Sequence, residues 1–307
     1  MKRLAGRTAV ITGAGSGFGL ELSRLLAREG MSLVMADVQA AALEAAAAEV
    51  RGLGAEVLAQ VVDVAKAEQV EALGAATLAR FGAPGVVFNN AGVGAGGLIW
   101  EHTLKDWEWV VGVNLMGVAH GVRVFTPLML AQAQRNPQFA GHIVNVASMA
   151  GLLNSPNMGV YNVSKHAVVA LSETLYQDLS LVTEQVHASV LCPYFVPTGI
   201  HQSHRNRPQE LKSDARPTAS QMIAQAMSTK AVTSGRVTAA DTAKLVFDAV
   251  EAGRFYVYTH PQALGMVQTR LEDVVMGRNP TDPFSGKPEI GQQLRTALRE
   301  AQAKAGG

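Results

Sequence analysis

Residues 8–19 read Thr-Ala-Val-Ile-Thr-Gly-Ala-Gly-Ser-Gly-Phe-Gly, and they join a short apolar run to an amphipathic segment. The run Thr8–Thr12 has the composition of a buried strand, and residues 17–29 have helical periodicity. The glycines between them permit positive φ and bring the backbone close to a phosphate at the helix N-terminus. The stretch therefore predicts a nucleotide site, although its spacing, G-x-x-x-G-x-G, differs from the common G-x-G-x-x-G and glycine-rich turns also serve packing.

The same alternation of apolar run and helical pattern continues along the chain. Strands are expected at Thr8–Thr12, Ser32–Ala36, Val57–Val62, Val86–Asn89, Gly141–Ala147, His187–Cys192 and Phe255–Tyr258. Helical patterns lie near 17–29, 39–51, 67–80, 104–134, 157–183 and 239–252. Apolar strands without polar alternation are typical of a parallel sheet covered on both faces. The sequence therefore predicts an α/β fold, a doubly wound parallel sheet of seven strands with helices on both faces.

Two segments interrupt the alternation. Residues 200–236 are polar and turn-rich and follow the sixth strand, at the edge of the sheet where ligands bind in such folds. We predict that they form a substrate lid on a domain spanning residues 1–260. Residues 261–307 follow the last strand, with a helix expected near 289–304, and are predicted to form a helical extension packed on that domain.

Composition excludes several classes of protein. Of the 307 residues, 26 are basic and 25 acidic, so the charge pattern of a nucleic-acid binder is missing. The single cysteine, Cys192, cannot form an internal disulfide and favours a reducing, cytoplasmic location. No Cys/His cluster has the spacing of a metal site, and His201 with His204 is interpreted as part of a solvated loop. No apolar run approaches the ~18 residues that span a bilayer.

Asp37 lies 20 residues after Gly17, at the end of the second predicted strand. A carboxylate at this place can accept hydrogen bonds from the ribose hydroxyls of a dinucleotide. A helix N-cap is the alternative role for Asp37, and the two roles are compatible. A methyltransferase that binds S-adenosylmethionine would share these features, so they predict a nucleotide site without specifying the reaction.

Tyr161 and Lys165 are one helical turn apart on the same face of a predicted helix. A nearby ammonium group lowers the pKa of a phenol and makes it usable as an acid or base near neutral pH. Ser148 lies 13 residues upstream, just beyond the fifth predicted strand, where its hydroxyl can hold a substrate oxygen. A lone Y-x-x-x-K is common on helix surfaces, but here it follows the glycine loop and Asp37 in order.

Taken together, these motifs resemble the short-chain dehydrogenase/reductase family, closely over residues 6–199 and more loosely to about 260. The resemblance rests on the glycine loop, Asp63-Val64, Asn89 to Gly92, Asn114, Ser148, Tyr161 with Lys165, and Pro193 to Thr198. It implies a Rossmann-like domain that binds NAD(P) and transfers a hydride between the cofactor and a substrate. Neither a non-catalytic nucleotide sensor nor a methyltransferase needs the Ser148, Tyr161 and Lys165 set.

By this resemblance, Tyr161 is the general acid/base, Ser148 polarises the reacting oxygen, and Lys165 binds the nicotinamide ribose and tunes Tyr161. Asn114 would hold a water of the proton relay. The implied cofactor-binding residues are Gly13, Ser16, Gly17, Phe18, Gly19, Asp37, Asp63, Val64, Asn90, Ala91, Gly92, Tyr161, Lys165, Pro193, Val196 and Thr198.

The expected cofactor is NAD, because Asp37 would repel a 2′-phosphate and no compensating cation is seen at Ser16, Phe18 or Val38. A reductase using NADPH is the alternative.

Phe18 and Tyr194 depart from the family pattern, which usually has an aliphatic residue and a glycine there. Tyr194 is therefore expected to narrow the substrate pocket. The pocket is predicted to be mainly apolar and to include Leu98, Trp100 and Met158, with Trp107 and Trp109 packing the following helix. We expect a bulky alcohol or ketone as substrate and a homodimer, with a homotetramer as the second possibility.

Overall fold

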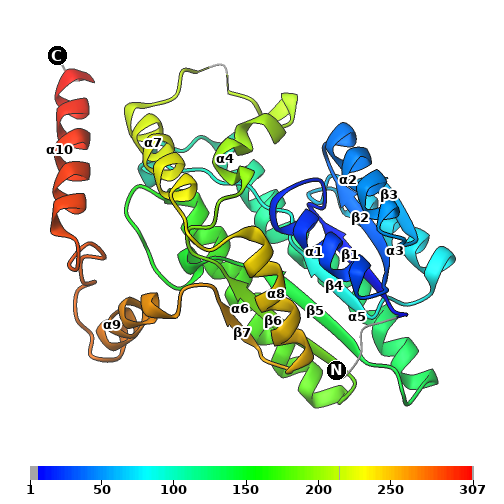
Figure 1. The fold of residues 1–307 in the computed structure, drawn as a ribbon. Helices are drawn as coiled ribbons and strands as arrows, with labels where there is room; N and C mark the ends of the chain where they lie inside the picture. The colour runs from blue at the N-terminus through cyan, green and yellow to red at the C-terminus, as the bar shows by residue number, and fades with distance from the viewer. Residues whose placement is uncertain (1–5, 214, 306–307) are drawn as a thin grey trace.

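The computed structural model describes residues 6–213 and 215–305 and has a seven-stranded parallel sheet at its centre (Figure 1). The strand order is β3-β2-β1-β4-β5-β6-β7. The strands are β1 (Thr8–Thr12), β2 (Ser32–Asp37), β3 (Val57–Val61), β4 (Val86–Asn89), β5 (Gly141–Val146), β6 (Val186–Cys192) and β7 (Tyr256–Tyr258). All seven predicted strands are confirmed, and each bound agrees within one residue. The order reverses between β1 and β4, which opens a crevice at the carboxyl ends of these strands.

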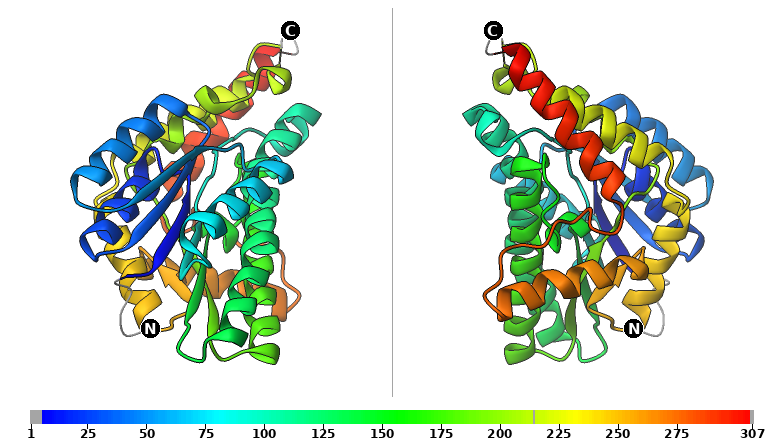
Figure 2. Two further views of the ribbon diagram at one scale, coloured as in Figure 1. Left: turned by 90° about the vertical axis from the view of Figure 1, so that its right-hand side faces the viewer. Right: turned by 90° about the vertical axis from the view of Figure 1, so that its left-hand side faces the viewer.

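Helices cover both faces of the sheet, so the chain has the predicted Rossmann-like, doubly wound architecture (Figure 2). One layer consists of α1 (Gly17–Arg28), α2 (Ala40–Gly52) and α8 (Ala239–Glu251). The other consists of α3 (Ala67–Phe81), α5 (Gly117–Arg135) and α6 (Gly159–Val182). All residues of the central strands β1, β4 and β5 are buried between these layers, which explains why these strands read as unalternated apolar runs.

Where α5 crosses the sheet it approaches β4 very closely. A Cβ at Gly121 would stand 1.9 Å from Oδ1 of Asn89, so only glycine fits at this crossing. The amide of Asn89 in turn donates to Asn145 Oδ1 at 2.8 Å, and Asn145 donates to the Ser172 hydroxyl on α6 at 3.0 Å. This buried amide–hydroxyl chain fixes α5 and α6 against the middle of the sheet, where the candidate site residues begin.

The predicted long helix over 104–134 is interrupted in the structure. It consists of α4 (Leu104–Val111), a π-helical turn η2 (Gly112–Met116) and α5. The stretch Leu104–Arg135 is long and apolar enough to pass a membrane-span criterion, with a mean hydropathy of 1.2 over 18 residues. Phe125 and Met129 on this stretch are fully buried in the core between α5 and the sheet. Of the 18 residues in that window, 39% are buried inside the fold.

The segment predicted as a polar lid contains more helix than its sequence suggests. After β6 the chain forms two 3₁₀ turns, η4 (Gly199–Asn206) and η5 (Gln209–Leu211), and then α7 (Ala219–Thr233). A capping box at Thr218 and Gln221 starts α7. This helix has little amphipathic pattern, which is why the sequence suggested only turns.

Beyond β7 the chain continues through η6 (Pro261–Ala263), α9 (Leu264–Val275) and α10 (Pro288–Ala305). The helix expected near 289–304 is confirmed. α10 packs beside α7, away from the sheet, and buries Leu294 (Figures 1 and 2). The C-terminal helix thus contacts the segment predicted to be the lid.

Candidate active site

A large cavity opens at the carboxyl ends of the strands and has a volume of about 1300 Å³. Ligand pockets usually enclose about 300–1,000 Å³, so this cavity has room for more than one small molecule. The glycine loop and Asp37 line one part of it, and Ser148 and Tyr161 line another. The segment after β6, α7 and the chain near Phe284 form further walls. The fold therefore gathers residues from across the sequence around one space.

The glycine loop after β1 is shaped for close backbone approach. Gly13 has a φ of 67°, and a Cβ there would stand 2.9 Å from Cα of Ala91. Asn90 secures the loop, because its amide donates to the Thr12 carbonyl oxygen at 2.8 Å. Ser16, Gly17 and Phe18 face the cavity, as expected. The loop thus points backbone N–H groups and the α1 N-terminus at the cavity, which is the arrangement that binds a pyrophosphate.

Gly19 differs from the other glycines of the loop. It does not line the cavity, and a Cβ there would lie 2.2 Å from the Gly13 carbonyl oxygen. Its small size lets the first turn of α1 pack against the loop. Gly19 therefore supports the shape of the glycine loop without lining the cavity.

Asp37 ends β2 at the edge of the cavity. Its Oδ2 accepts a hydrogen bond from the Gly15 backbone N–H at 2.9 Å, and Oδ1 accepts one from the Gln39 N–H at 2.9 Å. The carboxylate therefore joins the glycine loop to the entry of α2 and also faces the cavity. Asp37 is therefore not the N-cap of α2, which is Gln39, although it bonds the N–H of that residue, and its binding of a ribose stays a prediction.

The turns after β3 and β4 form the adjoining wall. Asp63 closes its own turn, with Oδ1 accepting from the Ala65 N–H at 3.0 Å, and Asp63 and Val64 line the cavity. Asn90, Ala91 and Gly92 line it as well. A Cβ at Gly92 would lie 3.4 Å from Asn114 Oδ1 and 3.5 Å from Lys165 Nζ, so a larger residue would crowd both groups.

The catalytic candidates converge from β5 and α6. Ser148 follows β5, and its hydroxyl donates to the Pro193 carbonyl oxygen at 3.4 Å. Tyr161 and Lys165 lie on the first turns of α6, with Lys165 Nζ 5.8 Å from the centre of the Tyr161 ring. All three line the cavity. The structure thus brings Ser148 together with Tyr161 and Lys165, which follow it by 13 and 17 positions in the sequence.

The pKa values of this group differ from the expectation. Burial raises the pKa of the Tyr161 phenol, and the Ser148 hydroxyl offsets part of that rise. Burial also lowers the pKa of Lys165 to about 8. The sequence led us to expect a lowered phenol pKa, and this expectation was wrong for the structure as it stands. The reason is that the Lys165 ammonium group donates to the Val146 carbonyl oxygen at 2.9 Å and does not contact the phenol oxygen.

Asn114 lies in the π-helical turn and is fully buried. Its Oδ1 accepts from the Val93 N–H at 2.8 Å, and its amide donates to the Val93 carbonyl oxygen at 2.9 Å and to the Ser164 hydroxyl at 3.1 Å. These bonds use the amide nitrogen of Asn114 and one of the two acceptor positions of Oδ1, and they hold the loop after β4 against α6. A π-helical turn is a frequent feature of functional sites. Asn114 does not itself line the cavity, and its expected role in holding a relay water stays a prediction.

The segment after β6 completes the site. Pro193 accepts from the Met149 N–H at 2.8 Å, and Pro193, Val196 and Thr198 line the cavity as expected. Tyr194 lines it too, and its ring lies 4.3 Å from Phe195 and 5.8 Å from His260 between centres. An aromatic ring thus stands where the family pattern has a glycine, which narrows this end of the cavity.

Some pocket predictions were wrong. Trp100 does not line the cavity, and its side chain is 71% exposed. Trp109, interpreted from the sequence as a packing residue, is 4% exposed and does line it. Phe284, Lys287 and Ile290 of the C-terminal segment also line the cavity, and no sequence signal indicated them. These residues lie far along the chain from every motif, and only the fold brings them to the site.

The residues present fit a nicotinamide dinucleotide. The cavity has a backbone cradle at which Cβ atoms would clash, a carboxylate at the end of β2, and a polar set of Ser148, Tyr161 and Lys165. In the described residues, no group of three or more His, Cys, Asp or Glu side chains could hold a metal ion. The glycine cradle, the carboxylate and the polar set together suit a nicotinamide dinucleotide.

Comparison with known proteins agrees with the geometry. The family model for short chain dehydrogenases matches residues 7–209. A crystal structure of a short chain dehydrogenase/reductase from Burkholderia phymatum in complex with NAD has a TM-score of 0.90 and 52% sequence identity. The match covers 93% of this chain and 100% of that one.

Curated relatives are also dehydrogenases by name. A CLA biosynthesis dehydrogenase/reductase from Lactiplantibacillus plantarum is 32% identical over 280 residues, 90% of this chain and 95% of the relative. A 1-deoxy-11-beta-hydroxypentalenate dehydrogenase from Streptomyces exfoliatus is 33% identical over 270 residues, 87% of this chain and 88% of the relative. With the fold, the site and these matches in agreement, the chain is a member of the short-chain dehydrogenase/reductase family and an oxidoreductase.

Proposed function

We propose that the protein interconverts a secondary alcohol and a ketone on a bulky, mainly apolar substrate with NAD(H) as the cofactor. The observation that carries this proposal is the meeting of Ser148, Tyr161 and Lys165 with the glycine loop and Asp37 around one cavity. A non-catalytic nucleotide sensor would have no use for a buried tyrosine and lysine at the substrate end. The complete set therefore favours an enzyme.

In this mechanism the chain positions the substrate and moves a proton. The Ser148 hydroxyl donates to the reacting carbonyl oxygen, and the Tyr161 phenol gives that oxygen a proton during reduction or removes one during oxidation. Lys165, whose ammonium nitrogen lies 5.8 Å from the centre of the Tyr161 ring, would hold the ribose next to the nicotinamide. When bound, the nicotinamide supplies or accepts the hydride. The walls of the cavity exclude water from the reacting carbon.

The proposed substrate class follows from the cavity walls. Apolar side chains dominate the substrate end, among them Met149, Leu153, Met158, Tyr194 and Phe284. They require a substrate with substantial apolar surface, because a small polar alcohol would leave this surface in contact with water. The pentalenate name of one relative is consistent with a bulky substrate for this chain as well.

The test offers the protein NADH and ketones of graded size, and the oxidation of NADH is measured as the loss of its absorbance. We expect turnover with bulky alicyclic or aryl ketones and little turnover with acetone. A protein that binds NADH and turns over no ketone, and oxidises no matching alcohol with NAD, would support the sensor function and contradict the enzyme. A preference for NADPH would support the alternative reductase.

We also propose a cytoplasmic homodimer that binds neither nucleic acid nor membranes. The support is the neutral charge balance, the single buried cysteine, and the apolar side chains that α6 leaves exposed, such as Val163, Leu181 and Val182. A homotetramer is the second candidate, but the C-terminal extension after β7 occupies space beside the sheet edge. The domain assignment, 1–260 with 200–236 as the lid and 261–307 as the extension, belongs to the same proposal.

The oligomer prediction has a direct measurement. Light scattering at micromolar concentration is expected to give the mass of two 32.4 kDa chains. The variant Val163→Glu places a charge on α6 and probes whether this helix forms the dimer interface. Val163 is suitable because its side chain is 43% exposed in the single chain. If α6 forms the interface, this variant shifts toward the monomer. A monomeric wild type would refute the dimer.

A further inference from the structure

The segment of residues 199–211, called the strap here, crosses from the glycine loop to α4. Just before the strap, the Thr198 side chain lies 3.4 Å from where a Cβ of Gly17 would stand. In its middle, the Ser203 hydroxyl accepts from the Gly94 N–H at 2.9 Å. At its end, Arg207 forms an ion pair with Asp106 of α4. Between these anchors the strap lines the cavity, so it closes one side of the cofactor end.

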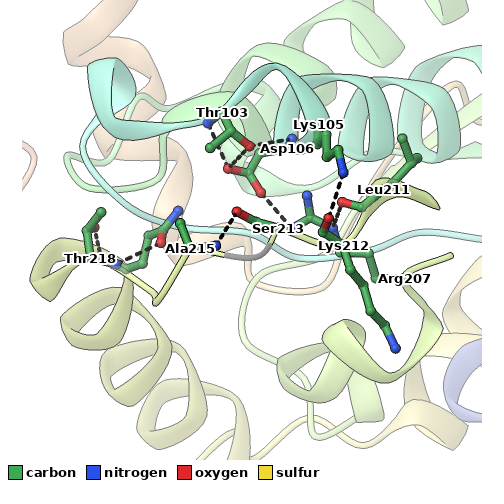
Figure 3. Close-up of polar contacts among 10 residues, drawn as sticks. Thr103, Lys105, Asp106, Arg207, Leu211, Lys212, Ser213, Ala215 and Thr218 are labelled. Atoms are coloured by element: carbon green, nitrogen blue, oxygen red, sulfur yellow. Dashed lines mark hydrogen bonds and ion pairs between the residues drawn. The ribbon is translucent and has the colours of Figure 1, made fainter. Parts of the chain in front are cut away.

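Arg207 contacts three different groups at the end of the strap. Its Nη1 donates to Asp106 Oδ1 at 2.6 Å, and its Nε donates to the Leu211 carbonyl oxygen at 2.7 Å (Figure 3). Its guanidinium carbon lies 5.1 Å from the ring centre of Trp109. Trp109 and Leu211 both line the cavity, whereas Arg207 does not. Arg207 therefore holds two pieces of the cavity wall together from behind.

The partner carboxylate is itself held in place. Asp106 Oδ2 accepts from the Thr103 N–H at 2.8 Å and from the Thr103 hydroxyl at 2.9 Å, in the capping box that starts α4 (Figure 3). Burial would raise the pKa of Asp106, but the hydrogen bonds from Thr103 and Arg207 outweigh it and keep that pKa below its usual value. The pair is therefore ionised at neutral pH.

This ion pair differs from the surface pairs of the molecule. The side chains of Arg207 and Asp106 are 15% and 9% exposed, whereas Arg80 and Glu56 form a pair with 63% and 65% exposure. Water and salt screen an exposed pair and leave it little net strength. A buried pair with additional hydrogen bonds is screened much less, and removing one partner has a large effect on dissociation.

We propose that the Arg207–Asp106 pair is a latch that keeps the strap closed over the cofactor, and that release of the cofactor requires this pair to break. Arg207 is thus a positioning residue, because it acts on the cavity through Trp109 and Leu211. This inference rests on the proposed nicotinamide site and adds to it the step that limits cofactor exchange. Cofactor exchange through a closing segment sets the turnover rate of many enzymes.

The test measures NADH release from the full-length protein by stopped-flow fluorescence, with excess NAD as the competitor. Arg207→Met keeps the length of the side chain but removes the charge and the donors, and is expected to raise the NADH release rate about tenfold or more. Asp106→Asn keeps an oxygen for the capping box and is expected to act in the same direction. The double variant should release NADH no faster than the stronger single variant, because both changes break one contact.

Three controls separate a latch from general stabilisation. Arg80→Met breaks an exposed pair and should leave NADH release unchanged. Arg207→Lys keeps the positive charge but cannot bond Asp106 and the Leu211 carbonyl oxygen at once as the guanidinium group does. Its NADH release rate should therefore fall between those of the wild type and Arg207→Met. The melting temperature of each variant is measured as well. It identifies any variant whose NADH release rate changes only because part of the protein is unfolded.

Hydrogen exchange supplies a readout that needs no cofactor. In Arg207→Met, amides of residues 200–211 are expected to exchange faster, while β1 and β5 stay as protected as in the wild type. Equal NADH release and equal exchange in wild type and Arg207→Met would overturn the latch. A wild type that binds neither NADH nor NADPH would instead overturn the proposed function, and this result is distinct from the first.

Discussion

Replacing Tyr161 with phenylalanine is expected to lower kcat by ~10² to 10⁴ while leaving NADH binding nearly unchanged. Phenylalanine preserves the ring that packs at the start of α6, where Tyr161 is 8% exposed. It removes the only group at the reacting oxygen that can give or take a proton. Because the hydroxyl contributes to proton transfer and little to cofactor contact, the loss should appear in kcat and not in the Kd for NADH.

The matched control is Tyr176→Phe on the same helix. Tyr176 is 42% exposed and its ring contacts Phe255, with ring centres 4.9 Å apart, so it lies outside the cavity. This variant should retain wild-type kcat. If Tyr161→Phe keeps more than about a tenth of the wild-type rate, another group carries the proton and the assignment is wrong.

The wild-type protein is expected to prefer NAD(H) over NADP(H) by ~100-fold or more in kcat/KM. The Asp37 carboxylate faces the cavity with its two oxygens already held by the N–H groups of Gly15 and Gln39. A 2′-phosphate would bring a charge of about −2 beside it. Like charges in such a place cost several kcal/mol, and each ~1.4 kcal/mol is worth a factor of ten.

The cofactor preference is tested by a pair of substitutions. Asp37→Ala combined with Val38→Arg removes the carboxylate and adds a cation at a side chain that lines the cavity. The double variant should narrow or invert the ratio of the two kcat/KM values. Equal efficiency of the wild type with both cofactors would show that Asp37 acts only at the entry of α2.

The parts of the fold that could be predicted from the sequence are those set by local pattern. β1, for example, is a continuous run of buried residues, and its strand bounds match the prediction at Thr8 and Thr12. The same holds for the glycine loop, since its backbone shape depends on residues adjacent in sequence. Ser148, Tyr161 and Lys165 were placed correctly because the fifth strand and α6 bring them to one edge of the sheet.

The substrate end could not be predicted, because long-range packing decides it. Trp100 was expected to line the pocket, yet it lies outside the cavity and is 71% exposed. Trp109 packs in a buried cluster, as expected, but it also lines the cavity, which its local sequence did not indicate. Phe284 likewise lines the cavity from a segment just before α10, and its position depends on packing between segments far apart in the sequence.

The pKa of Tyr161 shows a different limit. Spacing alone placed an ammonium group one turn from the phenol and predicted a lowered pKa. The spacing is correct, but the Lys165 ammonium group turns to the Val146 carbonyl oxygen, and burial then dominates the phenol. Sequence spacing sets which residues share a helix face, whereas the direction of a charged group depends on acceptors from other strands.

Deuterium transfer tests the central claim, hydride exchange with a carbonyl at the Ser148–Tyr161 pair, most directly. The protein is incubated with NADH that carries deuterium at both C4 positions of the nicotinamide, so that either face delivers deuteride, and with a bulky ketone that it reduces. The alcohol is then analysed by mass spectrometry. The account predicts an alcohol with a single deuterium on the carbinol carbon, formed by wild type and Tyr176→Phe and nearly absent with Tyr161→Phe. An alcohol without deuterium, or undiminished transfer by Tyr161→Phe, would contradict it.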